Sequence, residues 1–198
     1  MGTIVVVENI TLDGVMQSPG STDEDTRNGF RQGGWAIPYS DRVMAEKMGA
    51  GMGAGGSMLF GRRTYEQFHG FWSKQTDGNP YTEVLNRNRK YVVSRTGAES
   101  LPWENSTLVR GEAATTVAAL KQEVEGDLVV LGSGELVRSL TTAGLIDTYI
   151  LSIHPLTLGT GTRLFADGPA AYGRLELVEA LPTTTGVIIA TYRPATRS

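Results

Sequence analysis

Apolar and polar positions along the chain change period repeatedly, and each change predicts a switch between strand and helix. Short runs in which nearly every position is apolar predict buried strands, whereas apolar residues three and four positions apart predict helices. The predicted strands are residues 3–7, 57–60, 90–94, 107–110, 127–132 and 148–155. The predicted helices are residues 40–49, with Ser40 as N-cap, 62–72, 81–88, 113–126 and a segment that begins with Leu136.

The C-terminal part of the chain has a different pattern. Residues 175–181 and 186–192 are two strand-like runs joined by a short turn around residues 182–185, which predicts an antiparallel pair. Strands alternate with helices before this point and then end as a hairpin. The pattern therefore predicts an α/β fold whose sheet is mostly parallel with an antiparallel edge.

Composition narrows the class of protein. The 198 residues suit one domain over 1–198, and the absence of Cys excludes disulfides and thiolate metal sites. Glu66 and His69 are three positions apart on a predicted helix but have no evident third ligand, so no metal site is expected. A formal charge of −3 argues against a partner such as nucleic acid or a membrane surface. The N-terminal residues do not resemble a signal peptide, and no apolar run approaches the roughly 20 residues of a membrane span. We expect a cytoplasmic protein.

Glycines follow the strand at 127–132 and precede a helical pattern. A turn of this kind, Gly132-Ser133-Gly134, can hold a phosphate on the free N–H groups of the helix, or it can be only a tight corner. A dinucleotide fingerprint of the Rossmann type needs a third glycine where Val137 stands, and the strand at 148–154 is not followed by an acidic residue. These departures disfavour a Rossmann domain, and the absence of Gly-Lys-Ser/Thr excludes a Walker A loop.

Two other strand ends carry groups that suit phosphate. Arg62 and Arg63 follow Gly61 at the start of a helix, where cations oppose the helix dipole, so an anionic ligand is one explanation and solvent exposure the other. Ser94 and Arg95 follow the strand at 90–94. Because ligands of open α/β sheets lie beyond the carboxyl ends of the strands, the three sites together favour a phosphate ligand more than any one does.

Candidates for acid–base chemistry are less specific. Asp13 follows the first strand in an Asp-Gly pair that also suits a simple turn, and Asp41 falls at the start of a helix, where it stabilises the dipole. Trp35 and Tyr39 lie in the long loop at 17–40 and could face a substrate or fill a hydrophobic plug. Neither His69 nor His154 stands in a recognisable catalytic motif.

Five segments taken together resemble the dihydrofolate-reductase-like superfamily, and within it the reductase domain of riboflavin biosynthesis and its stand-alone relatives. They are ITLDGV (10–15), MLFGRRTYEQF (58–68), YVVSRT (91–96), VVLGSGELVRSL (129–140) and LTLGTGTRLF (156–165). The resemblance implies a three-layer fold with a mixed sheet of about eight strands and helices on both faces. It also implies NADPH as cofactor and a homodimer.

The resemblance also implies roles for individual residues. Phosphate contacts fall on Gly61, Arg62, Arg63 and Thr64, the 2′-phosphate region on Ser94 and Arg95, the pyrophosphate on Gly132, Ser133, Gly134, Glu135 and Leu136, and the nicotinamide flank on Ile10, Val15 and Met16. Asp13 matches the Leu-Asp-Gly of the riboflavin branch, where that residue lies near the substrate, and is the catalytic candidate. The proton could come from Asp13, from a carboxylate of the helix at 40–49 or from ordered water, and Trp35, Tyr39 and Asp41 are the candidate substrate contacts. The substrate would lie between residues 13–40 and the end of the strand at 148–154, with residues 158–165 closing it.

The expected function is NADPH-dependent hydride transfer to a small heterocyclic substrate of the ribosylaminopyrimidine kind. One alternative is a pterin or folate reductase, which the lack of a clear match to the folate-site acid at Asp41 or Glu46 disfavours. Another is a non-catalytic module that binds NADP(H). The zinc deaminase domain that often accompanies riboflavin reductases needs Cys ligands, and the chain has none.

Overall fold

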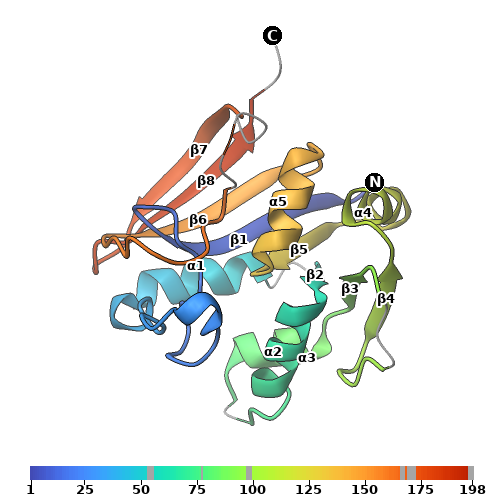
Figure 1. Cartoon of the computed structure of the whole chain (residues 1–198), viewed down its shortest axis with the longest axis horizontal. Helices are drawn as coiled ribbons and strands as arrows, with labels where there is room; N and C mark the ends of the chain where they lie inside the picture. The colour runs from blue at the N-terminus through green and yellow to red at the C-terminus, as the bar shows by residue number, and fades with distance from the viewer. Residues whose placement is uncertain (53–55, 77, 97–99, 166–167, 169–172, 196–198) are drawn as a thin grey trace.

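The computed structural model describes residues 1–52, 56–76, 78–96, 100–165, 168 and 173–195, so the glycine-rich patch at 48–57 lies partly outside the described residues (Figure 1). The strands are β1 (Thr3–Thr11), β2 (Ser57–Gly61), β3 (Lys90–Ser94), β4 (Ser106–Arg110), β5 (Asp127–Leu131), β6 (Thr148–His154), β7 (Leu175–Pro182) and β8 (Ile188–Pro194). The α-helices are α1 (Arg42–Met52), α2 (Arg62–Trp72), α3 (Pro80–Arg87), α4 (Ala113–Glu123) and α5 (Gly134–Thr142), and two 3₁₀ turns lie at Arg27–Gly29 and Ile37–Tyr39.

All eight strands belong to one mixed sheet with the order β4-β3-β2-β5-β1-β6-β8-β7. The first six strands pair in parallel, while β8 pairs antiparallel with both β6 and β7. The structure thus confirms the predicted mostly parallel sheet and its C-terminal antiparallel hairpin.

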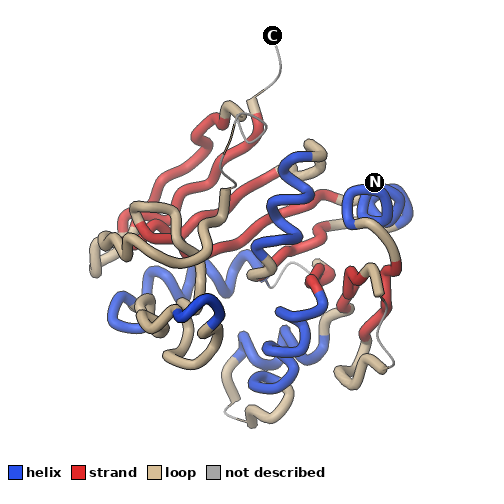
Figure 2. The backbone as a smooth tube through the Cα atoms, viewed as in Figure 1, coloured by secondary structure: helices blue, strands red, loops and turns tan. Residues whose placement is uncertain are grey.

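Helices cover both faces of the sheet, which Figure 2 shows as blue coils on either side of the red strands. Side chains of α4 and α5, among them Val117 and Leu136, pack with Ile4 and Val6 of β1 in one core. On the opposite face, α2 and α3 pack against β2 and β3, and Met44 of α1 packs against Ile150 of β6. None of the helices in the described residues is long and apolar enough to cross a bilayer.

Several predicted boundaries differ from the structure, for example the end of α4 at Glu123 instead of residue 126, and two of the differences bear on the site. The first strand was predicted to end at residue 7, but β1 continues to Thr11 because it pairs with β6 from Val5 to Thr11. Asp41, not Ser40, caps α1, since its Oδ1 accepts the N–H of Met44 at 2.8 Å. The longer β1 carries Glu8 and Asn9 into the centre of the sheet.

The centre of the sheet contains a topological switch point. From β1 the chain crosses to α1 on one face, whereas from the neighbouring β5 it crosses to α5 on the other face. In open α/β sheets a crevice opens between the carboxyl ends of two such strands, and ligands bind there. The fold therefore places a binding crevice beside Gly132, which directly follows β5.

Candidate functional site

A cleft of about 900 Å³ lies along the carboxyl ends of the central strands. It joins three predicted phosphate sites, namely the β2–α2 turn, the end of β3 and the β5–α5 turn. Of the fourteen residues assigned to the cofactor, twelve line the cleft: Met16, Gly61, Arg62, Arg63, Thr64, Ser94, Arg95, Gly132, Ser133, Gly134, Glu135 and Leu136. Ile10 and Val15 do not; both are buried in apolar clusters.

The β5–α5 turn depends on its glycines. Gly132 has φ of +66°, and a Cβ there would stand 3.0 Å from Cγ2 of Thr64. A Cβ on Gly134 would stand only 2.7 Å from Sδ of Met16. The left-handed backbone at Gly132 therefore favours glycine, whereas a Cβ at Gly134 would require the flexible side chain of Met16 to move.

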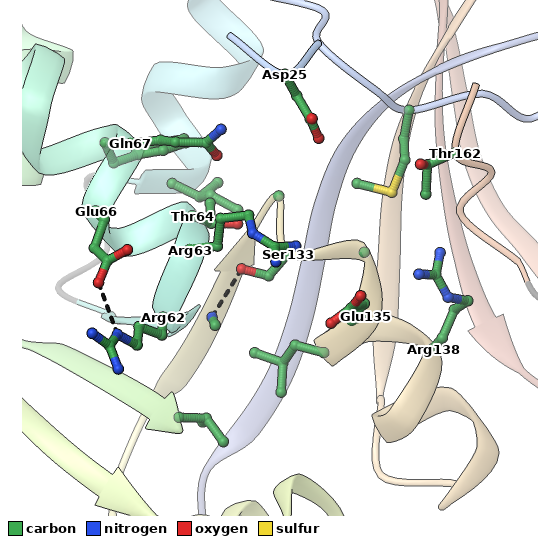
Figure 3. Close-up of a pocket in the computed structure, with 18 of the residues that line it drawn as sticks. Asp25, Arg62, Arg63, Thr64, Glu66, Gln67, Ser133, Glu135, Arg138 and Thr162 are labelled. Atoms are coloured by element: carbon green, nitrogen blue, oxygen red, sulfur yellow. Dashed lines mark hydrogen bonds and ion pairs between the residues drawn. The ribbon is translucent and has the colours of Figure 1, made fainter. Parts of the chain in front are cut away.

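The turns after β2 and β5 are joined to each other. Ser133 Oγ accepts the backbone N–H of Gly61 at 2.9 Å, the bond drawn to Ser133 in Figure 3. Ser133 itself has φ of +69°, which directs the chain into α5. The N-terminus of α5 and the start of α2 consequently flank one space, where the free N–H groups of a helix favour an anion.

Arginines on α2 and after β3 bring positive charge to this space. Arg62 forms an ion pair with Glu66, with 2.8 Å between Nε and Oε1, while Arg63 extends towards Ser133 (Figure 3). Arg95 lies 3.8 Å from Glu112 in a second, exposed pair. Exposed pairs of this kind contribute little stability, so a phosphate can replace the carboxylates at small cost.

Asp13 lies outside the cleft lining. Its carboxylate accepts the hydroxyl of Thr11 and the backbone N–H groups of Leu158 and Gly159, the last at 2.7 Å. These bonds, with the Thr11 hydroxyl first, lower the pKa of Asp13, so it is ionised at neutral pH and holds no proton to donate. We therefore reassign Asp13 from proton donor to an anchor for the loop after β6.

The end of β6 is filled by aromatic rings and is not open to a substrate. His154 is fully buried, and the rings of Trp35 and Tyr39 meet it edge-on at centroid distances of 5.1 and 5.5 Å. Nε1 of Trp35 donates to the carbonyl oxygen of Gln17 at 2.8 Å. Burial lowers the pKa of His154 to about 4, so the ring is neutral. These contacts favour the hydrophobic plug over the substrate-facing pair.

Asp41, the third predicted substrate contact, has a structural role, because both of its carboxylate oxygens accept hydrogen bonds from the protein itself. Besides capping α1, its Oδ2 accepts the N–H and the hydroxyl of Thr184, at 2.7 and 2.6 Å. These bonds, the Thr184 hydroxyl first, lower the pKa of Asp41. The carboxylate ties α1 to the β7–β8 turn and does not line the cleft.

Sequence reasoning gave no site role to several acids that line the cleft, among them Glu8 and Glu24. Glu8 is 6% exposed, and burial, reinforced by the charge of Glu24, raises its pKa well above the usual value. Burial also raises the pKa of Glu24. The available signal was a carboxylate directly after an apolar strand run, a position that rarely holds Glu without a partner.

Comparison with known proteins agrees with this geometry. The family model described as RibD C-terminal domain matches residues 3–189. The chain belongs to the RibD C-terminal domain family. It is 28% identical to the uncharacterized protein YyaP of Bacillus subtilis (strain 168) over 140 residues, which are 69% of this chain and 72% of YyaP.

Solved structures share the fold of this family member. A riboflavin-biosynthesis-like protein from Shewanella sp. PV-4 superposes with a TM-score of 0.66 at 18% identity, covering 98% of this chain and 99% of the other. Dihydrofolate reductase from Enterococcus faecalis, solved with NADP(H) and RAB-propyl, superposes with a TM-score of 0.61 at 13% identity, covering 97% and 96%. The chain therefore has the fold of reductase-like proteins, as the sequence resemblance implied.

Proposed function

We propose that this RibD C-terminal domain protein is an NADPH-dependent reductase of a small heterocyclic molecule of the ribosylaminopyrimidine kind. The proposal rests mainly on one observation. The β2–α2 turn, the end of β3 and the β5–α5 turn, whose groups all suit a phosphate, line one cleft at the switch point of the sheet. The family supports a reductase, and a relative of the same fold binds NADP(H).

The residues present fit a dinucleotide phosphate. Gly132 and Gly134 carry no side chain to cover the turn, and the start of α5 offers its first N–H groups to a pyrophosphate. Arg62, Arg63 and Arg95 supply guanidinium groups on the other side of the cleft, suited to a 2′-phosphate. When bound, NADPH supplies the hydride, and the protein orients it against the substrate and excludes water.

The cleft supports a riboflavin-type substrate more than a folate. A folate reductase needs a free carboxylate on the helix after the first strand, and the carboxylate of Asp41 there is held by Met44 and Thr184. The substrate would instead lie beside Met16, Gln17 and the loop residues Glu24, Asp25, Arg27 and Asn28, which line the cleft.

The proposal predicts a clear difference between the two nicotinamide cofactors. NADPH should raise the thermal unfolding midpoint of the purified protein, because a ligand that binds only the native state stabilises it by mass action. NADH, which lacks the 2′-phosphate, should raise it much less. Differential scanning fluorimetry with titrated cofactor measures both, followed by turnover against a panel of ribosylaminopyrimidine, pterin and folate compounds.

The outcomes of this experiment separate the alternatives. A midpoint that moves with neither cofactor contradicts the whole proposal. Selective stabilisation by NADPH without reduction of any compound on the panel indicates a non-catalytic binding module. Reduction confined to pterins or folates would replace the proposed substrate class and keep the cofactor.

We further propose that the protein forms a homodimer through the exposed edge of the sheet. β7 is the outermost strand, and Leu175, Leu177 and Val178 on it are 39%, 57% and 52% exposed. An apolar edge strand pairs readily with another strand. Replacing Leu175 and Leu177 together by Glu should convert a dimer into a monomer in light scattering. A monomeric wild type, or a double variant that stays dimeric, contradicts this interface.

A further inference from the structure

Glu8 is an acid in the middle of the central strand of the sheet. It lies on β1 between Val6 and Ile10, whose side chains share its face and are buried in the core formed with α4 and α5. A carboxylate is costly in such surroundings unless it is paired or neutralised. The fold gains no stability from it that an apolar residue would not give.

The other buried charged side chains in the described residues are satisfied, and Glu8 is not. Lys90 donates to the carbonyl oxygens of Asn86, Asn88 and Glu104 at 2.9, 2.8 and 3.1 Å, and Lys121 pairs with Asp147. Oε1 of Glu8, in contrast, has no hydrogen-bond partner. Glu8 also lines the cleft, so this buried side chain forms part of the wall of the space proposed for a ligand.

The charges around Glu8 favour its neutral form. Burial raises the pKa of Glu8, the nearby charge of Glu24 raises it further, and a hydrogen bond from the N–H of Gly132 opposes both. Glu24 holds its own charge better because its Oε2 accepts the N–H groups of Gly20 and Ser21 at 2.7 and 3.3 Å. The other charged groups that line the cleft among the described residues are Asp25 and Arg27 on the loop, Arg62, Arg63 and Glu66 on α2, Arg95 and Glu112 after β3 and β4, and Glu135 and Arg138 on α5. Arg27 forms an ion pair with Asp25, and Arg138 donates a hydrogen bond to the carbonyl oxygen of Arg163 at 2.8 Å.

We propose that Glu8, buried in the wall of the cleft with an unpartnered carboxyl oxygen, is the proton donor of the reduction. The inference rests on the proposed reductase function. As the hydride from NADPH bonds to the carbon of the substrate C=N or C=O, the Glu8 O–H bond breaks and its proton bonds to the nitrogen or oxygen. NADPH is thereby oxidised to NADP⁺, the substrate is reduced by two electrons and two hydrogens, and the Glu8 carboxylate recovers a proton from water. This role replaces the one suggested for Asp13.

The first test reads the protonation state without turnover. Infrared difference spectra between wild type and Glu8→Gln at neutral pH should show a protonated-carboxyl band that the variant lacks. Exposed Glu123 on α4, replaced by Gln, is the matched control and should leave that band in place. Absence of the band at neutral pH in the wild type overturns the proposal.

The second test reads stability against pH. A raised native pKa means that the native protein keeps a proton that the unfolded chain releases, so stability falls as pH rises from the usual range of Glu towards the native pKa. Glu8→Gln has no such loss. Its unfolding midpoint should therefore rise relative to the wild type between acidic and alkaline pH, which also shows that the variant folds. Parallel profiles for wild type and variant would contradict a raised pKa.

The third test is single-turnover reduction of a compound that the wild type reduces. Glu8→Gln should lower the rate by about 10²–10⁴-fold, the usual contribution of a general acid, with an NADPH Kd within about threefold of wild type. Glu24→Gln removes the neighbouring charge and should move the alkaline fall in rate to lower pH. Reduction by Glu8→Gln at the wild-type rate overturns the donor role. A wild type that neither binds NADPH nor reduces any compound overturns the proposed function instead, while the infrared band still reports on Glu8.

Discussion

Gly161→Ala is expected to lower the free energy of unfolding by about 2–5 kcal/mol, through backbone strain and overpacking together. Gly161 has φ of +113°, a conformation that costs energy for any residue with a Cβ. A Cβ there would also stand 2.7 Å from Cγ1 of Val15 and 2.8 Å from Cε2 of Phe30. Both neighbours are buried, so they have little room to move.

Gly159 provides the matched control in the same loop. Its φ is +70°, but a Cβ there would meet nothing within 4 Å, so Gly159→Ala should cost only the left-handed strain of about 1–2 kcal/mol. The difference between the two variants reports on the packing of the loop against Val15 and Phe30. For a protein of this size each kcal/mol shifts the thermal midpoint by roughly 2–4 °C. Equal midpoints for the two variants would show that this packing does not limit stability.

The loop that contains Gly161 also forms one side of the cleft. Thr162 accepts the N–H of Met16 at 2.9 Å through its carbonyl oxygen and donates its own N–H to Oε1 of Gln17 at 2.9 Å. Met16, Gln17 and Thr162 all line the cleft. Gly161→Ala should therefore disturb the ligand site as well as the core, which distinguishes it from a distant core variant.

The spacing of apolar residues predicted most of the strands and helices, because the burial of each element follows the period of its own side chains. The run at 90–94 has apolar side chains between polar ends, and β3 has those same bounds. The helix from Leu136 was predicted from its spacing, and Leu136, Val137 and Leu140 are buried on one face of α5. The end of β1 was missed because polar Glu8 and Asn9 break the apolar run, whereas pairing with β6, which is distant in sequence, extends the strand. Tertiary pairing thus overrides a local signal.

The contrast between local sequence patterns and contacts between distant segments also explains which parts of the site could be predicted. The glycine turns were predictable because a phosphate-friendly strand end is a local pattern, and these residues converge in the structure. The role of Asp13 could not be predicted in this way, because its partners Leu158 and Gly159 lie about 145 positions later in the chain. An Asp-Gly pair reveals only that a turn exists and not which distant backbone the carboxylate binds. Glu8 required the opposite reasoning, in which a residue that conflicts with its strand indicates a function.

Replacing Arg62 and Arg63 together by Ala is expected to remove most of the preference for NADPH over NADH. A hydrogen bond to a charged group contributes roughly 1.5–3 kcal/mol, so each lost contact with the 2′-phosphate should raise the NADPH Kd about tenfold to hundredfold. NADH has no phosphate at that position, so its Kd should change much less. Fluorescence titration of both cofactors against wild type and variant measures the two ratios.

Two controls sharpen this experiment. Arg62→Ala leaves the carboxylate of Glu66 in the cleft without its 2.8 Å partner, and that negative charge alone would weaken any anionic ligand. Adding Glu66→Gln to the double variant removes this charge, and the remaining loss of NADPH affinity then reports on the guanidinium groups. Arg42→Ala, on the exposed first turn of α1, lowers the net charge away from the cleft and should alter neither Kd. Equal weakening of NADPH and NADH in the triple variant would mean that Arg62 and Arg63 hold phosphates common to both cofactors, and Ser94 with Arg95 would then remain to read the 2′-phosphate.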